Sequence, residues 1–219
     1  MSGELIDRAD RVGPWPRWWL RLLDPWQLVS VLLGLALLAV AVGVWRTRPP
    51  AEGSAEVGFV RDMIAHHEQA VEMALIIRDR SSDEVLRAFA TDIILTQQGQ
   101  IGRMTGWLEA WGRPFAGAEA PMGGMGAMMG MAPQAEVNAL RELPVAEAEV
   151  RFLQLMTTHH QGALQMAEDV LAARPHALVA DLATAVLRGQ QAEIAFMAEL
   201  LALRGAEPPP PLPPMDHGH

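Results

Sequence analysis

The sequence predicts an all-α protein: a four-helix bundle built from two repeated helical hairpins and preceded by one transmembrane helix. Three observations lead to this prediction. A block of residues recurs after a fixed interval of 93 positions, its apolar residues have helical spacing, and a long uncharged stretch precedes the first copy. At that interval Phe59, Met63, His66, His67, Met73 and Ala74 return as Phe152, Met156, His159, His160, Met166 and Ala167.

The predicted transmembrane helix covers residues 26–45, after a cytoplasmic segment at 1–25. Trp26 to Trp45 contains 20 positions without a charge, which is enough helix to cross the hydrocarbon of a bilayer. Four of the arginines before the span lie close to it and only two follow closely, so the N-terminus is expected in the cytoplasm and the C-terminal domain outside the plasma membrane. A cleaved signal peptide is the alternative, although no clear small-x-small cleavage site precedes Pro49.

A linker at 46–54 leads into the predicted bundle domain at 55–205. Within the domain, Ser82 is a candidate N-cap, Pro144 opens a helix, and Gly112 and Gly205 are stop signals. Short connections inside each pair predict antiparallel hairpins. A Met- and Gly-rich linker at 112–143, with a short helix at 134–142, joins the hairpins, and the Pro-rich tail at 206–219 is expected to be disordered. The four expected helices cover about 55–80, 83–111, 144–174 and 176–204.

Histidine and glutamine are the polar residues on the predicted apolar faces. On a helical wheel His66 and His159 lie mid-face, and His67 and His160 lie at the edge of the apolar stripe. The second helix of each hairpin carries one Gln, Gln97 or its repeat Gln190, among apolar residues. A buried imidazole needs a partner, so His–Gln pairing without any metal is one reading. A duplicated metal site is the other.

The residue types favour a soft metal. The chain has no Cys, and no Glu-x-x-His occurs in it, which disfavours thiolate and di-iron carboxylate sites. Thioether and imidazole ligands suit Cu(I), and imidazole also suits Cu(II), whereas zinc at His alone is less favoured. Taken singly, each Met is more typical of core filling. The candidate ligands are Met63, His66, His67, Met156, His159 and His160, followed by Met73, Met104, Met166 and Met197.

Further methionines occupy the linker, where a Gly-rich backbone offers them no face to bury. We interpret this run as an arm that captures or stores Cu(I). The alternatives are a disordered segment in which Met is incidental and a hydrophobic patch that covers the end of the bundle. Two histidines and a methionine near the C-terminus could extend the arm. These secondary candidates are Met122, Met125, Met128, Met129, Met131, Met215, His217 and His219.

Several function classes are disfavoured. All 17 basic residues are Arg and the net charge is −9, which argues against a nucleic-acid surface. No nucleophile–base arrangement or phosphate-binding glycine loop is evident, so we expect no enzymatic activity.

The two repeats resemble the family catalogued as domain of unknown function 305. The similarity rests on the segments from Phe59 to Ala74 and from Phe152 to Ala167, together with Gln97 to Met104 and its repeat. It implies a ferritin-like four-helix bundle, often exported, with some members associated with copper binding and tolerance. Gln69 departs from the family's usual Gly after His-His-x, and the second repeat has Met-Thr-Thr.

We therefore expect a membrane-anchored, outward-facing protein that binds copper to sequester it, to confer tolerance or to exchange it with a donor or acceptor protein. The alternatives are a structural or interaction module without metal and, less favoured, a ferritin-like metal oxidoreductase. The sequence leaves open whether the two His-His motifs form one site or two.

Overall fold

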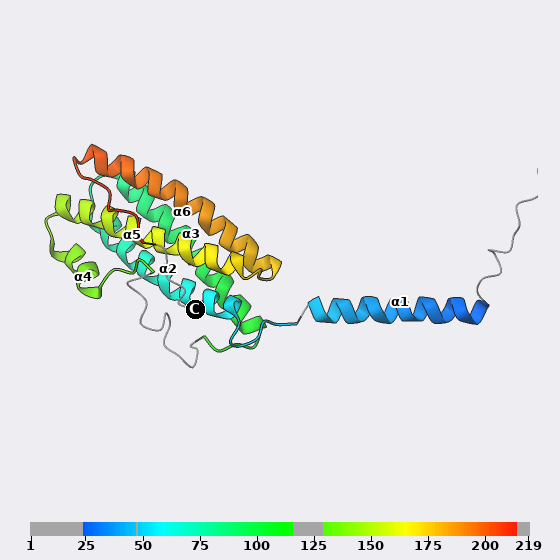
Figure 1. Ribbon diagram of the computed structural model, residues 1–219. Coiled ribbons are helices and arrows are strands. Elements are labelled where there is room, and N and C mark those ends of the chain that lie inside the picture. The colour runs from blue at the N-terminus through cyan, green and yellow to red at the C-terminus, as the bar shows by residue number, and fades with distance from the viewer. Residues whose placement is uncertain (1–23, 47, 116–128, 214–219) are drawn as a thin grey trace, which may run out of the picture. The chain divides into compact units, whose positions relative to one another are not determined.

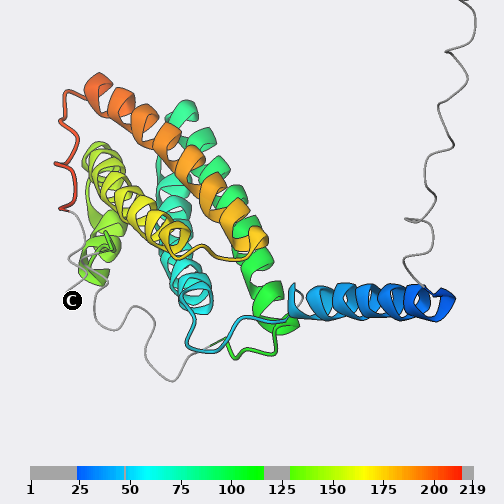
Figure 2. The same ribbon diagram turned by 45° about the vertical axis from the view of Figure 1, so that its right-hand side comes forward.

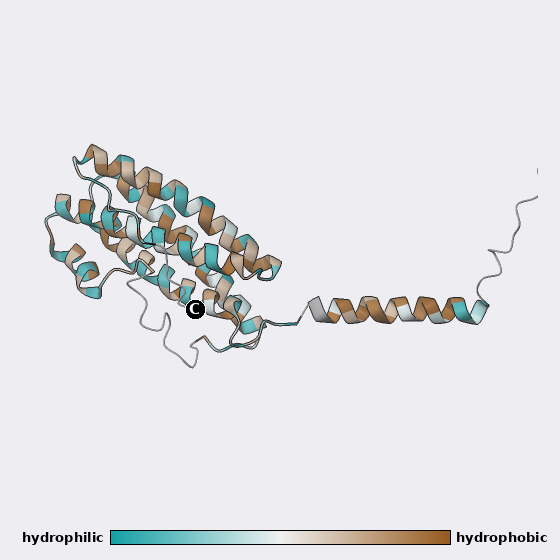
Figure 3. Cartoon of the chain, in the orientation of Figure 1, coloured by the Kyte–Doolittle hydropathy of each residue, from teal (hydrophilic) through white to brown (hydrophobic). Residues whose placement is uncertain are grey.

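The computed structural model describes residues 24–46, 48–115 and 129–213, and every regular element in these ranges is an α-helix. The chain divides into two compact units, residues 1–48 and 49–219. In the first unit, α1 (Pro25–Arg46) is mostly apolar along the face that Figure 3 shows. By length and composition alone, Pro25–Val44 could cross a membrane.

The second unit contains two helical hairpins and one short helix (Figure 1). The two long helices at the centre, α2 and α5, pack against one another, and each also packs against the partner in its own hairpin. In Figure 2, α3 and α6 lie together on one side of the pair formed by α2 and α5. The helices are α2 (Ala55–Arg80), α3 (Glu84–Ala110), α4 (Gln134–Glu142), α5 (Val145–Ala172) and α6 (Ala177–Leu203).

Local signals account for most helix ends. Ser54 caps α2 by accepting a hydrogen bond from an amide of the first turn. The prediction that Ser82 caps the next helix is wrong, because the Asp83 carboxylate accepts from two amides of α3 and is the better placed acceptor. Gly112 ends α3 at φ 63° and Gly205 follows α6 at φ 67°, each in a Schellman turn that needs a left-handed residue.

The core consists of two apolar clusters that the repeat relates to one another. One contains Met63, Met104 and Met166, and the other contains their counterparts Met156, Met197 and Met73. Because the N-terminal half of α2 shares a cluster with the C-terminal half of α5, these helices cross antiparallel about a pseudo-twofold axis. The crossing point lies between the two clusters, at the His-His motifs.

The helix α4 covers only one end of the central pair. Val137 and Leu140 on α4 are fully buried in the cluster that holds Met73. Arg80, at the end of α2, donates to the carbonyl groups of Leu140 and Leu143 and so holds the C-terminal end of α4. The symmetry of the two hairpins is therefore broken by the linker.

The C-terminal tail departs from the expected disorder. Residues 206–213 run along α5, where the side-chain amides of Gln154 and Gln165 donate to the carbonyl groups of Glu207 and Pro213. A Pro-rich segment loses little entropy when it is fixed in an extended form, and its carbonyls stay available as acceptors. Composition alone could not reveal these glutamine partners.

Candidate metal centre

The structure brings the two His-His motifs together at the crossing of α2 and α5. The rings of His66 and His159 lie against one another, with centroids 3.6 Å apart and planes tilted by 32°. All four motif histidines are fully buried, including His67 and His160, which the sequence places at the edge of the apolar face. They are buried because α3 and α6 cover that edge. The arrangement is one centre on the pseudo-twofold axis.

Hydrogen bonds select the tautomer of three of these rings. The Nε2 atom of His66 lies 3.0 Å from the carbonyl oxygen of Met129, and that of His160 lies 2.6 Å from a carboxylate oxygen of Glu193. Because these oxygens can only accept, each Nε2 carries the proton and each Nδ1 keeps its lone pair. His67 makes the same kind of bond, 2.6 Å from Oε1 of Gln100. Second-shell partners of this type orient metal-binding histidines.

The lone pairs left over have no protein partner. The Nδ1 atoms of His66, His67 and His160 are buried without a hydrogen bond, and His159 has neither ring nitrogen bonded. Buried polar atoms are seldom left in this state without a reason such as an ion or a water. The unpartnered nitrogen atoms of His66 and His159 therefore belong to rings 3.6 Å apart, whereas the rings of His67 and His160 lie 6.4 and 6.3 Å from their neighbours in the same motifs.

Burial also favours the neutral form of three of these rings. It lowers the pKa of His66 to about 3, with a further contribution from the neighbouring His67. Burial lowers the pKa of His67 to about 4 although its bond to Gln100 opposes the shift, and it holds the pKa of His159 well below the usual range. A neutral imidazole is the form that binds a metal ion.

The metal-free pairing of histidine with Gln97 or Gln190 is not what the structure has. Both amide atoms of Gln97 and the Oε1 atom of Gln190 are buried without a partner. Their side chains line a hollow of about 50 Å³ between α3 and α6, together with Gln100 and Glu193. The partners that the histidines do use lie one turn further along the same helices.

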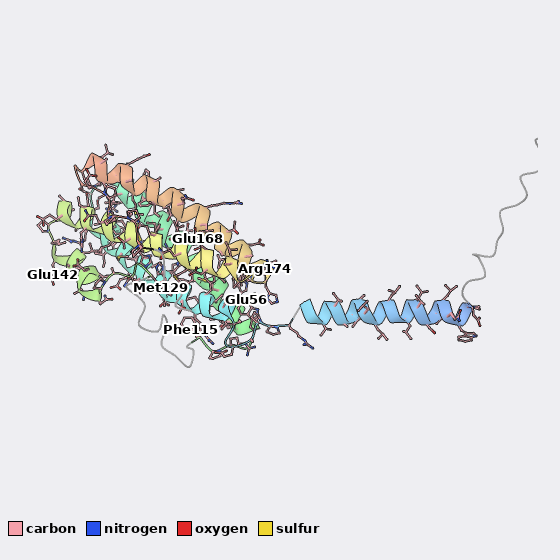
Figure 4. The ribbon with its side chains drawn as sticks, in the orientation of Figure 1. Glu56, Phe115, Met129, Glu142, Glu168 and Arg174 are labelled. Carbon is pink, nitrogen blue, oxygen red and sulfur yellow. The ribbon has the colours of Figure 1, made fainter. Side chains whose placement is uncertain are left out.

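A short stretch of the linker, residues 129–132, lies across α2 and α5 and is called the strap below. Figure 4 marks Met129 at its start. Gln69 clamps the strap by exchanging two hydrogen bonds, of 2.9 and 2.8 Å, with the backbone of Ala132. Its repeat counterpart Gly162 has a different role: a Cβ there would lie 1.7 Å from the Met129 carbonyl oxygen. The departure of the first repeat from the family's Gly thus has a structural reason.

The methionines of the bundle flank the histidine layer on both sides. Met63, Met104 and Met166 lie in the cluster at one end and Met73, Met156 and Met197 in the cluster at the other, all six buried. Of the linker candidates, Met129 is buried and Met131 partly buried against the first cluster. The remaining secondary candidates, Met122, Met125, Met128, Met215, His217 and His219, lie outside the described residues.

A carboxylate does reach the centre, which the sequence did not suggest. Glu193 is only partly buried but contacts the fully buried His160. Within the described ranges, however, no three His, Asp or Glu side chains are arranged to hold an ion. A site for a hard metal is therefore not preformed here.

The sequence analysis did not place Gln100, Gly162 or Glu193 at the site, and it noted Gln69 only as a departure from the family pattern. The 93-residue interval contained a signal for all of them, because Gln100 maps onto Glu193 and Gln69 maps onto Gly162. Each pair differs in residue type, so a search for identical residues passed over it.

Comparison with known proteins agrees on fold and family. The model of the family described as Domain of unknown function (DUF305) matches residues 56–201. A crystal structure of a DUF305 protein from Streptomyces coelicolor, presumed secreted, is 45% identical with a TM-score of 0.69 and covers 73% of this chain and 99% of its own. A DUF305 fragment from Deinococcus radiodurans is 41% identical with a TM-score of 0.64, covering 71% and 99%. No curated protein matched.

A third structure is that of CopM in its Cu(II)-bound form. It is 26% identical with a TM-score of 0.56 and covers 65% of this chain and 92% of its own. CopM in its Cu(I)-bound form, at 24% identity, is similar in fold. The family match spans most of the bundle, and both DUF305 structures cover more than two thirds of the chain, so this protein belongs to the DUF305 family.

Proposed function

We propose that this protein binds copper, chiefly Cu(I), at the histidine layer between α2 and α5 and either sequesters the ion or hands it on. The single observation that carries the proposal is the close pair His66 and His159 with unpartnered ring nitrogens on the pseudo-twofold axis. The likeness to CopM, a protein crystallised with copper bound, supports the choice of metal.

The ligand set would combine imidazole with thioether. Met63 precedes His66 by three residues and His67 by four, which is one helical turn in either case. Met156 has the same relation to His159 and His160. Thioether sulfur favours Cu(I), and imidazole accepts both oxidation states.

A binding role without chemistry fits this arrangement best. The rings are fully buried, and Glu193, the carboxylate that contacts the centre, is bonded to His160. With α1 as an anchor in the plasma membrane and the bundle outside the cytoplasm, the protein would hold copper at the outer face of the membrane. Copper donors or acceptors would then be its partners.

The competing proposal is a structural bundle without metal. It is favoured by one observation, namely that three of the four histidines already have a hydrogen bond through Nε2. In that case the unpartnered Nδ1 atoms would bind water or nothing. The experiment must therefore remove Nδ1 and leave the Nε2 bonds intact.

Substitution of histidine by glutamine does this, since a Gln side-chain amide can donate from the Nε2 position but has no counterpart of Nδ1. We expect a triple variant at His66, His67 and His160 to lose at least roughly 100-fold in Cu(I) affinity, because several ligands disappear together. An anaerobic competition titration with a Cu(I) chelator measures the affinity. His176→Asn is the control, because His176 is exposed and remote.

A second pair of variants protects the test against loss of folding. Met63→Leu and Met156→Leu conserve volume and should leave the bundle folded. We expect the double variant to weaken Cu(I) binding by roughly tenfold or more, as loss of soft ligands requires. Unchanged affinity in all variants would refute the centre and favour the structural bundle. Deletion of residues 116–128 would test the linker arm separately.

A further inference from the structure

A second concave site lies near one end of the bundle, away from the histidine layer. It is a hollow of about 160 Å³ between the N-terminal half of α2 and the C-terminal half of α5. Two carboxylates and two thioethers line it, all on half-buried or buried side chains. The lining residues are Ala55, Phe59, Asp62, Met129, Met166, Asp169 and Val170.

The repeat supplies an internal control for this hollow. The equivalent groove at the opposite end of α2 and α5 is filled, because α4 packs into it. There Leu155 stands in place of Asp62 and Ile76 in place of Asp169, and both are buried. One groove thus has apolar residues beneath α4, whereas its twin has two acids and, among the described residues, no counterpart of α4.

The open groove also connects directly to the histidine layer. The side chain of Met129 lines the groove while its carbonyl oxygen accepts from His66. Met63 and Met104 belong to the same cluster as Met129 and Met166 and lie fully buried behind them. Carboxylate, thioether and imidazole therefore follow one another from the surface inward.

We propose that this groove is the access port through which Cu(I) reaches the histidine layer. Asp62 and Asp169 attract the hydrated cation, and Met129 and Met166 take it up as it loses water. Met63 and Met104 then pass it on towards His66, so the cation moves from carboxylate to thioether and finally to imidazole. This inference rests on the proposed copper centre and adds the route to it.

The test is the rate of metal association. Ag(I) serves as the probe, because it is a redox-stable soft cation. The full chain is studied in an uncharged detergent by stopped-flow tryptophan fluorescence, since Trp107 and Trp111 pack against the cluster behind the port. The variant pair is Asp62→Asn with Asp169→Asn.

A matched control removes two charges elsewhere. Glu84 and Asp92 are exposed on α3, where they line a different hollow that contains no methionine. We expect Asp62→Asn with Asp169→Asn to slow association by about fivefold at low salt, and the difference to shrink at high salt. Glu84→Gln with Asp92→Asn should bind at the wild-type rate. Met166→Leu should slow association with both acids present.

The outcomes separate the port from the centre. Equal rates for the two acid pairs would overturn the port, and so would a fall in equilibrium affinity as large as the fall in rate. In both cases tight binding by the wild type would leave the copper centre standing. Absence of any Ag(I) binding by the folded wild type would overturn the centre and the port together.

Discussion

Replacing Gly162 by alanine tests whether the strap holds the histidine layer in place. A Cβ at this position would lie 1.7 Å from the oxygen and 2.3 Å from the carbon of the Met129 carbonyl group. These are backbone atoms, so no side-chain rotation relieves the clash. An ordinary contact distance of about 3.5 Å requires the strap to move by roughly 2 Å, which breaks its 3.0 Å hydrogen bond with His66.

Three effects set the magnitude. The buried Nε2–H of His66 loses its acceptor, at a cost of about 2 kcal/mol. Crowding between the strap and α5 costs about 2 kcal/mol more. Alanine is the better helix former by about 1 kcal/mol. The free energy of unfolding should therefore fall by about 3 kcal/mol, which lowers Tm by roughly 6 to 12 °C for a unit of this size.

The assay is thermal and urea unfolding of residues 49–219 followed by circular dichroism. Gly102→Ala is the control, because this glycine is also inside a helix but a Cβ there would meet nothing within 4 Å. The control should gain up to about 1 kcal/mol. If Gly162→Ala proved as stable as Gly102→Ala, the close approach of the strap to α5 would be refuted.

Three further predictions follow from the same centre. In the folded protein the pKa values of His66 and His67 are about 3 and 4, so below about pH 6.5 the unfolded chain binds more protons than the folded one. Each of these histidines should therefore lower the free energy of unfolding, measured in urea, by about 2 kcal/mol between pH 7 and pH 5. A free energy that stays constant or rises on acidification would contradict their burial. Gln69→Ala removes both hydrogen bonds to the strap and should lower the free energy of unfolding in urea by about 2 kcal/mol. A loss below about 0.5 kcal/mol, the size of a typical surface substitution, would argue against the clamp. The double variant Met63→Leu with Met156→Leu should change the free energy of unfolding by less than about 1.5 kcal/mol while it weakens Cu(I) binding. Equal losses of stability and of Cu(I) affinity would assign both residues to packing alone.

Local patterns were sufficient for the helices. The expected spans agree with α2, α4 and α5 to within a few residues, and the stop signals at Gly112 and Gly205 end α3 and α6. Helical periodicity and turn residues act over one or two turns, so they are visible in the chain itself. The duplicated His-His motif likewise follows from the 93-residue interval.

Partners across helices were not predictable. The choice of Gln100 and Glu193 over Gln97 and Gln190 depends on how α3 is rotated against α2, and α6 against α5. Successive residues of a helix are turned by about 100°, so residues one turn apart, such as Gln97 and Gln100, point in similar directions. Periodicity alone therefore does not say which of the two meets a histidine on the neighbouring helix. The ordered tail along α5 escaped for a similar reason, because its glutamine partners come from another element.

The sequence by itself determined that this protein has two equivalent hairpins, an apolar N-terminal helix and a pair of His-His motifs surrounded by methionine, because these features are periodic along the chain. Only the tertiary structure decided that the two motifs meet, with the rings of His66 and His159 3.6 Å apart, and that α4 covers one groove and not its twin. The physical reason is that the crossing of α2 and α5 and the path of the linker between them depend on packing between distant residues, which no local pattern encodes.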